Sequence, residues 1–158
     1  MDWGPLASTS LGAVIGIATT LAADHLRARR SRADDDQSSR RQLYGDYLAA
    51  LARTRNVLRM AARPTTPPAA PGERTARAAQ AFHDSNAYEL RYQIAVVAPR
   101  DVVEASTAAF RALRDLKDHV EQGATVTDPA YTQARERWDH RLDELRMTMR
   151  RDLGRPVF

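Results

Sequence analysis

The residues best suited to chemistry in this sequence are its four histidines, because the chain contains no cysteine. The absence of thiols excludes disulfide bonds, cysteine nucleophiles and cysteine-ligated zinc or iron–sulfur centres. Imidazole can still act as a metal ligand or as an acid–base group near neutral pH. The histidines available for such roles are His25, His83, His119 and His140.

The spacing of acidic residues around these histidines does not predict a metal centre. A di-iron site in a helical bundle needs Glu-x-x-His on two helices and a glutamate on each of two others, and the sequence lacks this pattern. Glu136 precedes His140 by four residues, and Asp115 precedes His119 by four. Such pairs are common on charged helix faces and indicate solvated side chains. We expect no metal ion.

His83 differs from the others because it falls on a predicted apolar helix stripe. A partly buried histidine, bonded to the backbone or to a neighbour such as Asn86, is the plainer interpretation. The sequence has no glycine-rich phosphate loop, no Gly-x-Ser-x-Gly and no His-Glu-x-x-His. Trp138 and the tyrosines have helical spacing, which favours core positions over base-stacking platforms. We therefore predict no catalytic residue and no cofactor.

The basic character of the chain is weak evidence for a nucleic-acid partner. The formal net charge is +4, from 24 basic and 20 acidic residues, and Lys117 is the only lysine. Acidic residues are interleaved with the arginines over most of the chain, which predicts a mixed solvated surface. Abundant alanine and arginine are also what a GC-rich genome produces. This charge pattern argues against nucleic acid.

Residues 5–23, PLASTSLGAVIGIATTLAA, contain no charged side chain. As a helix they span roughly 28 Å, about the thickness of a bilayer core. Basic residues follow this segment, whereas Asp2 precedes it. Because cationic flanks stay in the cytoplasm, we expect a single-pass anchor over residues 1–24 in the cell membrane, with the N-terminus outside and the remaining chain in the cytoplasm.

Two other interpretations of this segment fit its residues less well. A cleaved signal peptide ending near Ala22 or Ala23 would carry its positive charge before the apolar run, and here the order is reversed. A buried helix of a soluble protein would tolerate the many small and hydroxylated residues. The length and the adjacent arginines favour the anchor.

Small residues recur every four positions along the predicted anchor, which permits close approach of two helix backbones. One interpretation is a homodimer through this face, and the other is that an alanine- and glycine-rich segment contains such a ladder by chance. The face consists of Ser8, Gly12, Gly16 and Thr20.

A charged juxtamembrane segment, residues 25–42, follows the anchor. Its arginines act as a topology signal or contact anionic lipid, at about 1 kcal/mol per residue, and both roles are compatible. Asp34, Asp35 and Asp36 follow and offset the local field, which places nucleic acid third. The lipid-contact candidates are Arg27, Arg29, Arg30 and Arg32.

A first amphipathic helix is predicted from a cap at Ser38 or Ser39 as far as Pro64. Whether it continues the anchor stays open. The proline-rich segment 64–72 is not helical and predicts a stiff connector in preference to an SH3 ligand, because no basic residue lies in its Pro-Pro core. The apolar face of this helix is Leu43, Tyr44, Tyr47, Leu48, Leu51 and Leu58.

Three further helices are predicted: 73–98, from Pro99 to Gly123, and from Asp128 to Gly154. The end of the first of them, 92–97, is β-branched enough for a strand but has no second strand to pair with. Its stripe is Ala76, Ala79, His83, Ala87, Leu90, Ile94 and Val97. The second stripe is Val102, Ser106, Ala109, Leu113, Leu116 and Val120, widened by Val103 and Phe110. The third is Tyr131, Ala134, Trp138, Leu142, Leu145, Met149 and Leu153.

These elements predict an all-α protein: one N-terminal transmembrane helix followed by an antiparallel bundle of about four amphipathic helices. The bundle would occupy residues 43–158. Three stretches of sequence resemble a group of actinobacterial single-span membrane proteins with a cytosolic helical domain. They are GAVIGIATTLAADHLRARR, RRQLYGDYLAALARTR and VVAPRDVVEAS. The resemblance implies this topology and fold, and it implies no activity or ligand.

The leading functional hypothesis is a non-enzymatic, membrane-tethered interaction or scaffold module. Its partners would be the lipid bilayer and a protein, or a second copy of the chain. One alternative is a small-ligand sensor or enzyme with an interhelical pocket near His83. Another is a membrane-surface or nucleic-acid binder acting through the arginine cluster.

Overall fold

The computed structural model describes residues 35–64 and 72–155, and the described chain is helical with no strand in these ranges. The chain divides into two units, Met1–Ser39 and Arg40–Phe158, and the bundle belongs to the second. The predicted all-helical fold is confirmed for this part. Its elements are helix 35–61, α2 (Glu73–Asp84), α3 (Ala87–Val97), α4 (Arg100–Glu121) and α5 (Pro129–Asp152).

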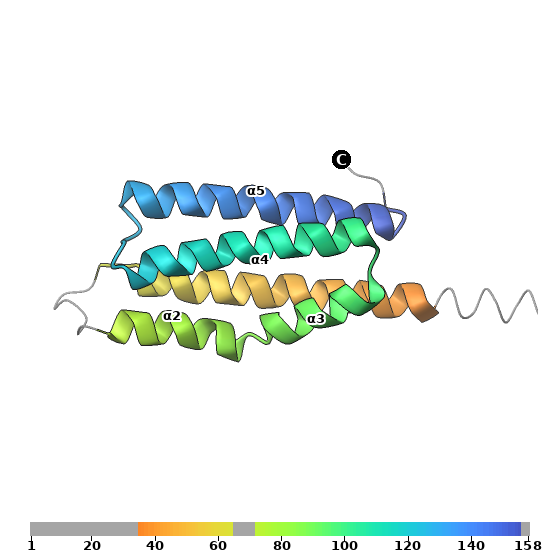
Figure 1. The fold of residues 1–158 in the computed structure, drawn as a ribbon, viewed down its shortest axis with the longest axis horizontal. Coiled ribbons are helices and arrows are strands. Elements are labelled where there is room, and N and C mark those ends of the chain that lie inside the picture. The colour runs from red at the N-terminus through yellow and green to blue at the C-terminus, as the bar shows by residue number, and fades with distance from the viewer. Residues whose placement is uncertain (1–34, 65–71, 156–158) are drawn as a thin grey trace, which may run out of the picture. The chain divides into compact units, whose positions relative to one another are not determined.

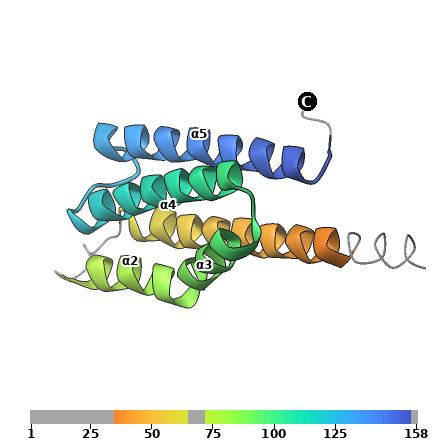
Figure 2. The ribbon, with the colours of Figure 1, turned by 45° about the vertical axis from the view of Figure 1, so that its right-hand side comes forward.

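The helices form an up-and-down bundle in which α2 and α3 follow one another along the same row (Figure 1). Helix 35–61 and α4 run in one direction, whereas the α2–α3 pair and α5 run in the other (Figure 2). Helix α4 contacts α2, α3 and α5. The predicted antiparallel bundle of about four amphipathic segments is therefore confirmed.

The core is built from the apolar stripes of these helices. Both α4 and α5 bury the residues predicted from their three- and four-residue spacing, with only Val103 and Leu153 partly exposed. Helix 35–61 buries Tyr44, Tyr47, Leu51 and Leu58, as predicted, and adds Thr54, whose hydroxyl donates to the Ala50 carbonyl. The internal bond satisfies this polar group, so its burial costs little.

The predicted helix over 73–98 is wrong in one respect, because it is broken at Ser85 and Asn86. Asn86 has φ +56°, in the left-handed region that asparagine tolerates better than most residues. The Ser85 hydroxyl donates to the Phe82 carbonyl and accepts the Ala87 N–H. The break ends α2 and starts α3 with a new orientation, so a single stripe cannot run through both helices.

The buried face of α2 consequently differs from the predicted stripe. Ala78, Ala81 and Phe82 face the core, whereas Ala76, Ala79 and His83 are exposed. In α3, Ala87 and Ile94 are buried as predicted, but Val97 is exposed. Alanine occurs on every face of α2, so the sequence offered little contrast from which to choose the core side.

The start of the first amphipathic helix also differs from the prediction. Residues 35–39 are already helical, so Ser38 and Ser39 lie inside the helix and are not its cap. The helix passes through residues 42 and 43, where a segment boundary was predicted. Within ranges 35–64 and 72–155, no helix combines the length and apolar character needed to cross a bilayer. The predicted anchor lies outside the described residues.

Two turns fix the end of the bundle where helix 35–61 and α4 finish. Gly123 has φ +100°, and the Ala124 N–H donates to the His119 carbonyl, which completes the predicted glycine C-cap of α4. Asp128 occupies the N-cap of α5, but its carboxylate turns back to accept the Thr125 N–H at 2.6 Å. The Val126 N–H donates to the Ala62 carbonyl and ties this turn to helix 35–61.

Candidate interaction surface

The most exposed apolar side chains of the described bundle lie along α3. Tyr88, Tyr92 and Val96 follow one another at four-residue steps, so they occupy one face of the helix. Their exposed fractions are 41%, 63% and 83%. Tyr88, Tyr92 and Val96 are called the α3 stripe below. A helix face that exposes a valine and two tyrosine side chains to solvent is typical of a contact surface.

The inner end of the α3 stripe is anchored in the core. The Tyr88 ring lies 4.8 Å from the Phe110 ring and 6.1 Å from the Phe82 ring, centroid to centroid. Phe82 and Phe110 in turn meet edge-on at 5.7 Å. Such contacts hold the Tyr88 ring in one orientation. The stripe therefore begins on a rigid base and not on a mobile surface side chain.

The Arg91 side chain packs against two aromatic rings at this face. Its guanidinium lies 5.1 Å from the Tyr92 ring centroid and 5.0 Å from that of Phe110. These are cation–π distances. The arginine bridges the exposed Tyr92 ring to the buried Phe110 ring, which restricts both. A preorganised aromatic surface loses less conformational entropy on binding.

Comparisons of the chain with family models, with curated proteins and with solved structures return no match. The site is therefore interpreted from its own geometry.

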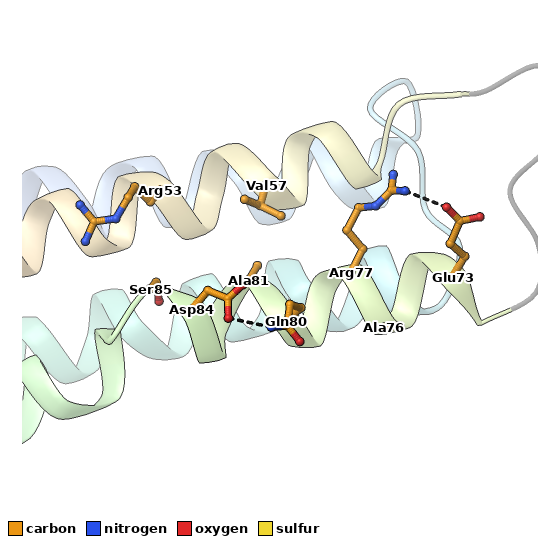
Figure 3. Close-up of a pocket in the computed structure, with 9 residues that line it drawn as sticks. All are labelled: Arg53, Val57, Glu73, Ala76, Arg77, Gln80, Ala81, Asp84 and Ser85. Atoms are coloured by element: carbon orange, nitrogen blue, oxygen red, sulfur yellow. Dashed lines mark hydrogen bonds and ion pairs between the residues drawn. The ribbon is translucent and has the colours of Figure 1, made fainter.

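A groove between helix 35–61 and α2 is the second candidate (Figure 3). It has a volume of about 520 Å³, and Arg53 and Val57 line it from helix 35–61. On α2, Arg77 pairs with Glu73 at 2.7 Å and Gln80 donates to Asp84 at 2.7 Å, so both acids are engaged along their own helix. No pair of acid and base converges across the groove, which leaves it without an evident reaction to perform.

His83 does not line this groove. It is exposed, against the prediction that it lies on a buried stripe, because α2 turns Ala78, Ala81 and Phe82 to the core instead. An interhelical pocket centred on His83 is therefore without geometric support in the described bundle. The predicted core role of the tyrosines also fails at Tyr88 and Tyr92, although it is confirmed for Tyr44, Tyr47 and Tyr131.

A charged hollow between α4 and α5 contains His140. Asp115, Glu136 and His140 line it together with arginines and alanines. The ring of His140 lies 3.6 Å from Glu144, not from Glu136 as its spacing suggested. Glu144 is also bonded to Arg141, and these contacts lower the pKa of its carboxyl. No group of three potential metal ligands lies close enough for coordination within 35–64 and 72–155.

The residues proposed from sequence for self-association and lipid contact lie outside the described residues. They are Ser8, Gly12, Gly16, Thr20, Arg27, Arg29, Arg30 and Arg32. The α3 stripe was not predicted as a surface. Its signal was present in the four-residue spacing of Tyr88, Tyr92 and Val96, but a continuous helix over 73–98 would have presented another face to the core.

Proposed function

We propose that this chain is a non-enzymatic, membrane-tethered protein-interaction module whose α3 stripe binds a helix of a partner protein. The exposed, core-anchored row of Tyr88, Tyr92 and Val96 carries the proposal. The tether is the uncharged segment 5–23, followed by its downstream arginines. The orientation expected from those arginines exposes the stripe to cytoplasmic partners.

A helix is the occupant that best fits the shape of this surface. Over eight residues the stripe extends about 12 Å along α3, and its side chains form a single i, i+4, i+8 ridge. Ridges of this kind pack into the groove of another helix. Recognition of amphipathic helices by apolar helix faces is a recurrent mode, in which aromatic anchors contribute most of the affinity.

The test compares stripe variants with a matched apolar variant elsewhere on the bundle. A photo-crosslinking amino acid placed at position 92, and separately at 96, should capture the same single partner in intact cells. With the crosslinking residue moved to the exposed position 93, the double variant Tyr92→Ser, Val96→Ser should lower capture of that partner by tenfold or more. Met147→Ser removes a similarly exposed side chain from α5 and should leave capture unchanged.

Two outcomes would overturn this assignment. If crosslinks from positions 92 and 96 reach different proteins at random, the stripe is ordinary surface. If they join only two copies of the chain, the α3 stripe is a self-association surface and the partner helix is its own α3. Far-UV circular dichroism of each variant controls for loss of the fold.

A further inference from the structure

Three arginines lie beside two buried aromatic residues, on helices other than the one that carries the α3 stripe. Arg55 and Arg59 come from helix 35–61, and Arg135 comes from α5. Beneath them lie Tyr131 and Trp138, which are 2% and 3% exposed. All three arginines are partly buried. The groups come from two antiparallel helices, so the cluster exists only in the folded bundle.

The cluster has more hydrogen-bond donors than acceptors. The Tyr131 hydroxyl and the Trp138 Nε1 are buried without a hydrogen-bond partner among the described residues, and so is the Nε atom of each of the three arginines. Buried polar atoms are nearly always satisfied, and an unpaired donor costs about 1–3 kcal/mol. Five such donors, shared between helix 35–61 and α5, indicate that these helices bind an acceptor.

One of the three guanidinium groups, that of Arg55, lies over the ring of the buried Trp138. Arg55 Cζ is 5.8 Å from the Trp138 ring centroid. Burial raises the pKa of the Tyr131 hydroxyl, and the charges of Arg55, Arg135 and Arg59 oppose that rise. Arg135 follows Tyr131 by four residues on α5, and Arg59 follows Arg55 by four on helix 35–61, so each helix carries these groups along one face. The phenol thus lies under a concentration of positive charge.

The carboxylates nearby do not neutralise this charge. Asp139, next to Trp138 on α5, raises the pKa of the Tyr131 hydroxyl, in the opposite sense to the arginines. Glu136 lies 3.9 Å from Arg135, beyond hydrogen-bond distance, and the Glu136 side chain is 67% exposed. Arg59 donates to the neutral Asn56 amide at 3.1 Å. Three guanidiniums and two carboxylates leave the cluster with a net positive charge.

We propose that Arg55, Arg59 and Arg135 bind an oxyanion of the phosphate class, with the Tyr131 hydroxyl as a further donor. Guanidinium groups bind phosphate through planar pairs of N–H donors, and partial burial strengthens each charge-assisted bond. Because the arginines retain solvent exposure, the anion reaches them from outside the bundle. Tyr131 lies below them and donates once the guanidiniums turn toward the ligand.

The experiment titrates inorganic phosphate into the full chain, purified in a non-ionic detergent. Trp138 reports binding by fluorescence when Trp3, the other tryptophan, is replaced in a Trp3→Phe variant. The wild-type chain provides a second readout, because a ligand that binds only the folded state raises Tm. Sodium chloride at equal ionic strength is the reference. We expect a saturable change with phosphate and none with chloride.

Variants separate a specific site from general attraction of anions. Arg59→Gln should weaken phosphate binding by about tenfold or more, the value expected for one charge-assisted hydrogen bond. Tyr131→Phe preserves the packing and should weaken it severalfold. The matched control is Arg53→Gln, which removes the same charge from the same helix at an exposed position and should change binding by less than about twofold.

Arg59→Lys keeps the proposal testable if Arg59→Gln fails to fold. It preserves the charge but not the planar pair of donors, so phosphate binding should still weaken. The idea is overturned if phosphate acts no differently from chloride, or if Arg53→Gln weakens binding as much as Arg59→Gln. It is also overturned if Arg59→Lys and Tyr131→Phe both bind phosphate as tightly as the parent chain does.

The phosphate could belong to a soluble ligand or to a lipid headgroup, and flotation with phosphatidate vesicles distinguishes these sources. Vesicle binding that Arg59→Gln abolishes and inorganic phosphate competes identifies a headgroup. Saturable binding of soluble phosphate without such vesicle binding identifies a free ligand. Either result supports the oxyanion site, and failure of both overturns it. None of these measurements depends on the α3 stripe, so they succeed or fail independently of the partner-helix proposal.

Discussion

The Tyr44 hydroxyl donates a 2.8 Å hydrogen bond to Asp152 Oδ2, joining residues 108 positions apart in the sequence. Arg40 lies 3.1 Å from the other oxygen of the same carboxylate. Asp152 is the last residue of α5, where a negative charge is unfavourable to the helix dipole. Its two partners, Tyr44 and Arg40, offset that cost and hold the end of α5 against helix 35–61.

This arrangement predicts that Asp152→Ala lowers the free energy of unfolding by about 1–3 kcal/mol, because two charge-assisted bonds are lost. Urea denaturation measures the change. Asp143→Ala is the control, since Asp143 makes an exposed bond to Arg146 on the same helix and should cost less than about 0.5 kcal/mol. Equal effects of the two variants would contradict a stabilising role for the Asp152 contacts.

The buried tyrosines predict a loss of stability in alkaline solution. Burial raises the pKa of Tyr44, and its bond to Asp152 raises it further; burial also raises the pKa of Tyr47. A tyrosine in the unfolded chain has a pKa of about 10. Above that pH the unfolded state loses protons that the native state retains, so the free energy of unfolding falls as pH rises. Below it, this contribution is present in full.

Urea midpoints between about pH 9 and 11 measure this effect, and tyrosinate absorbance should increase together with unfolding. Tyr44→Phe and Tyr47→Phe each remove one titrating group, so each variant should show a shallower decline with pH than the parent chain. The parent and both variants following the same curve would show that these hydroxyls do not govern alkaline stability.

Two glycines should respond to alanine in opposite directions. Gly123 has φ +100°, and nothing lies within 4 Å of the position that a Cβ would take, so Gly123→Ala suffers only from backbone strain, at about 1–2 kcal/mol. Gly45 lies inside helix 35–61 with equally open space around it. Gly45→Ala should therefore raise stability by about 0.5–1 kcal/mol. Thermal unfolding should give a lower Tm for Gly123→Ala and a higher Tm for Gly45→Ala. A higher Tm for Gly123→Ala would refute the strain argument.

The sequence predicted the bundle well wherever large apolar residues alternate with charges. In α5, Tyr131, Trp138 and Leu145 are separated by charged residues, so only one face can be buried, and Pro129 marks the beginning of the helix. Helix α4 offers the same contrast, and Gly123 marks its end. In α2, by contrast, Ala76, Ala78, Ala79 and Ala81 do not differ in apolar area, so the spacing of apolar residues did not single out the buried face.

The two surface proposals required the tertiary structure for different reasons. The α3 stripe follows from the turn at Asn86, because that turn decides which side of α3 faces the core. The arginine cluster follows from the register between helix 35–61 and α5. The four-residue spacing of Arg55 and Arg59 reads from sequence as a solvated pair, and nothing in it indicates that Trp138 lies opposite.

The proposed tether predicts that the chain remains in the membrane pellet after alkaline carbonate extraction. Arginine near the middle of an anchor opposes insertion by about 2.5–3.5 kcal/mol per residue. Val14→Arg combined with Ile15→Arg should therefore release the chain into the supernatant, whereas Ala13→Leu should leave it in the pellet. Release of the parent chain would exclude segment 5–23 as an anchor.

The proposed orientation of the tether rests on the arginines downstream of it, because positive flanks resist translocation. A fluorescent protein fused to the C-terminus should therefore be bright, and alkaline phosphatase at the same position should be inactive. Replacing Arg27, Arg29 and Arg30 with glutamine while placing three arginines before Leu6 should reverse both signals in part of the molecules. An active phosphatase fusion on the parent chain would place the α3 stripe outside the cell and exclude cytoplasmic partners.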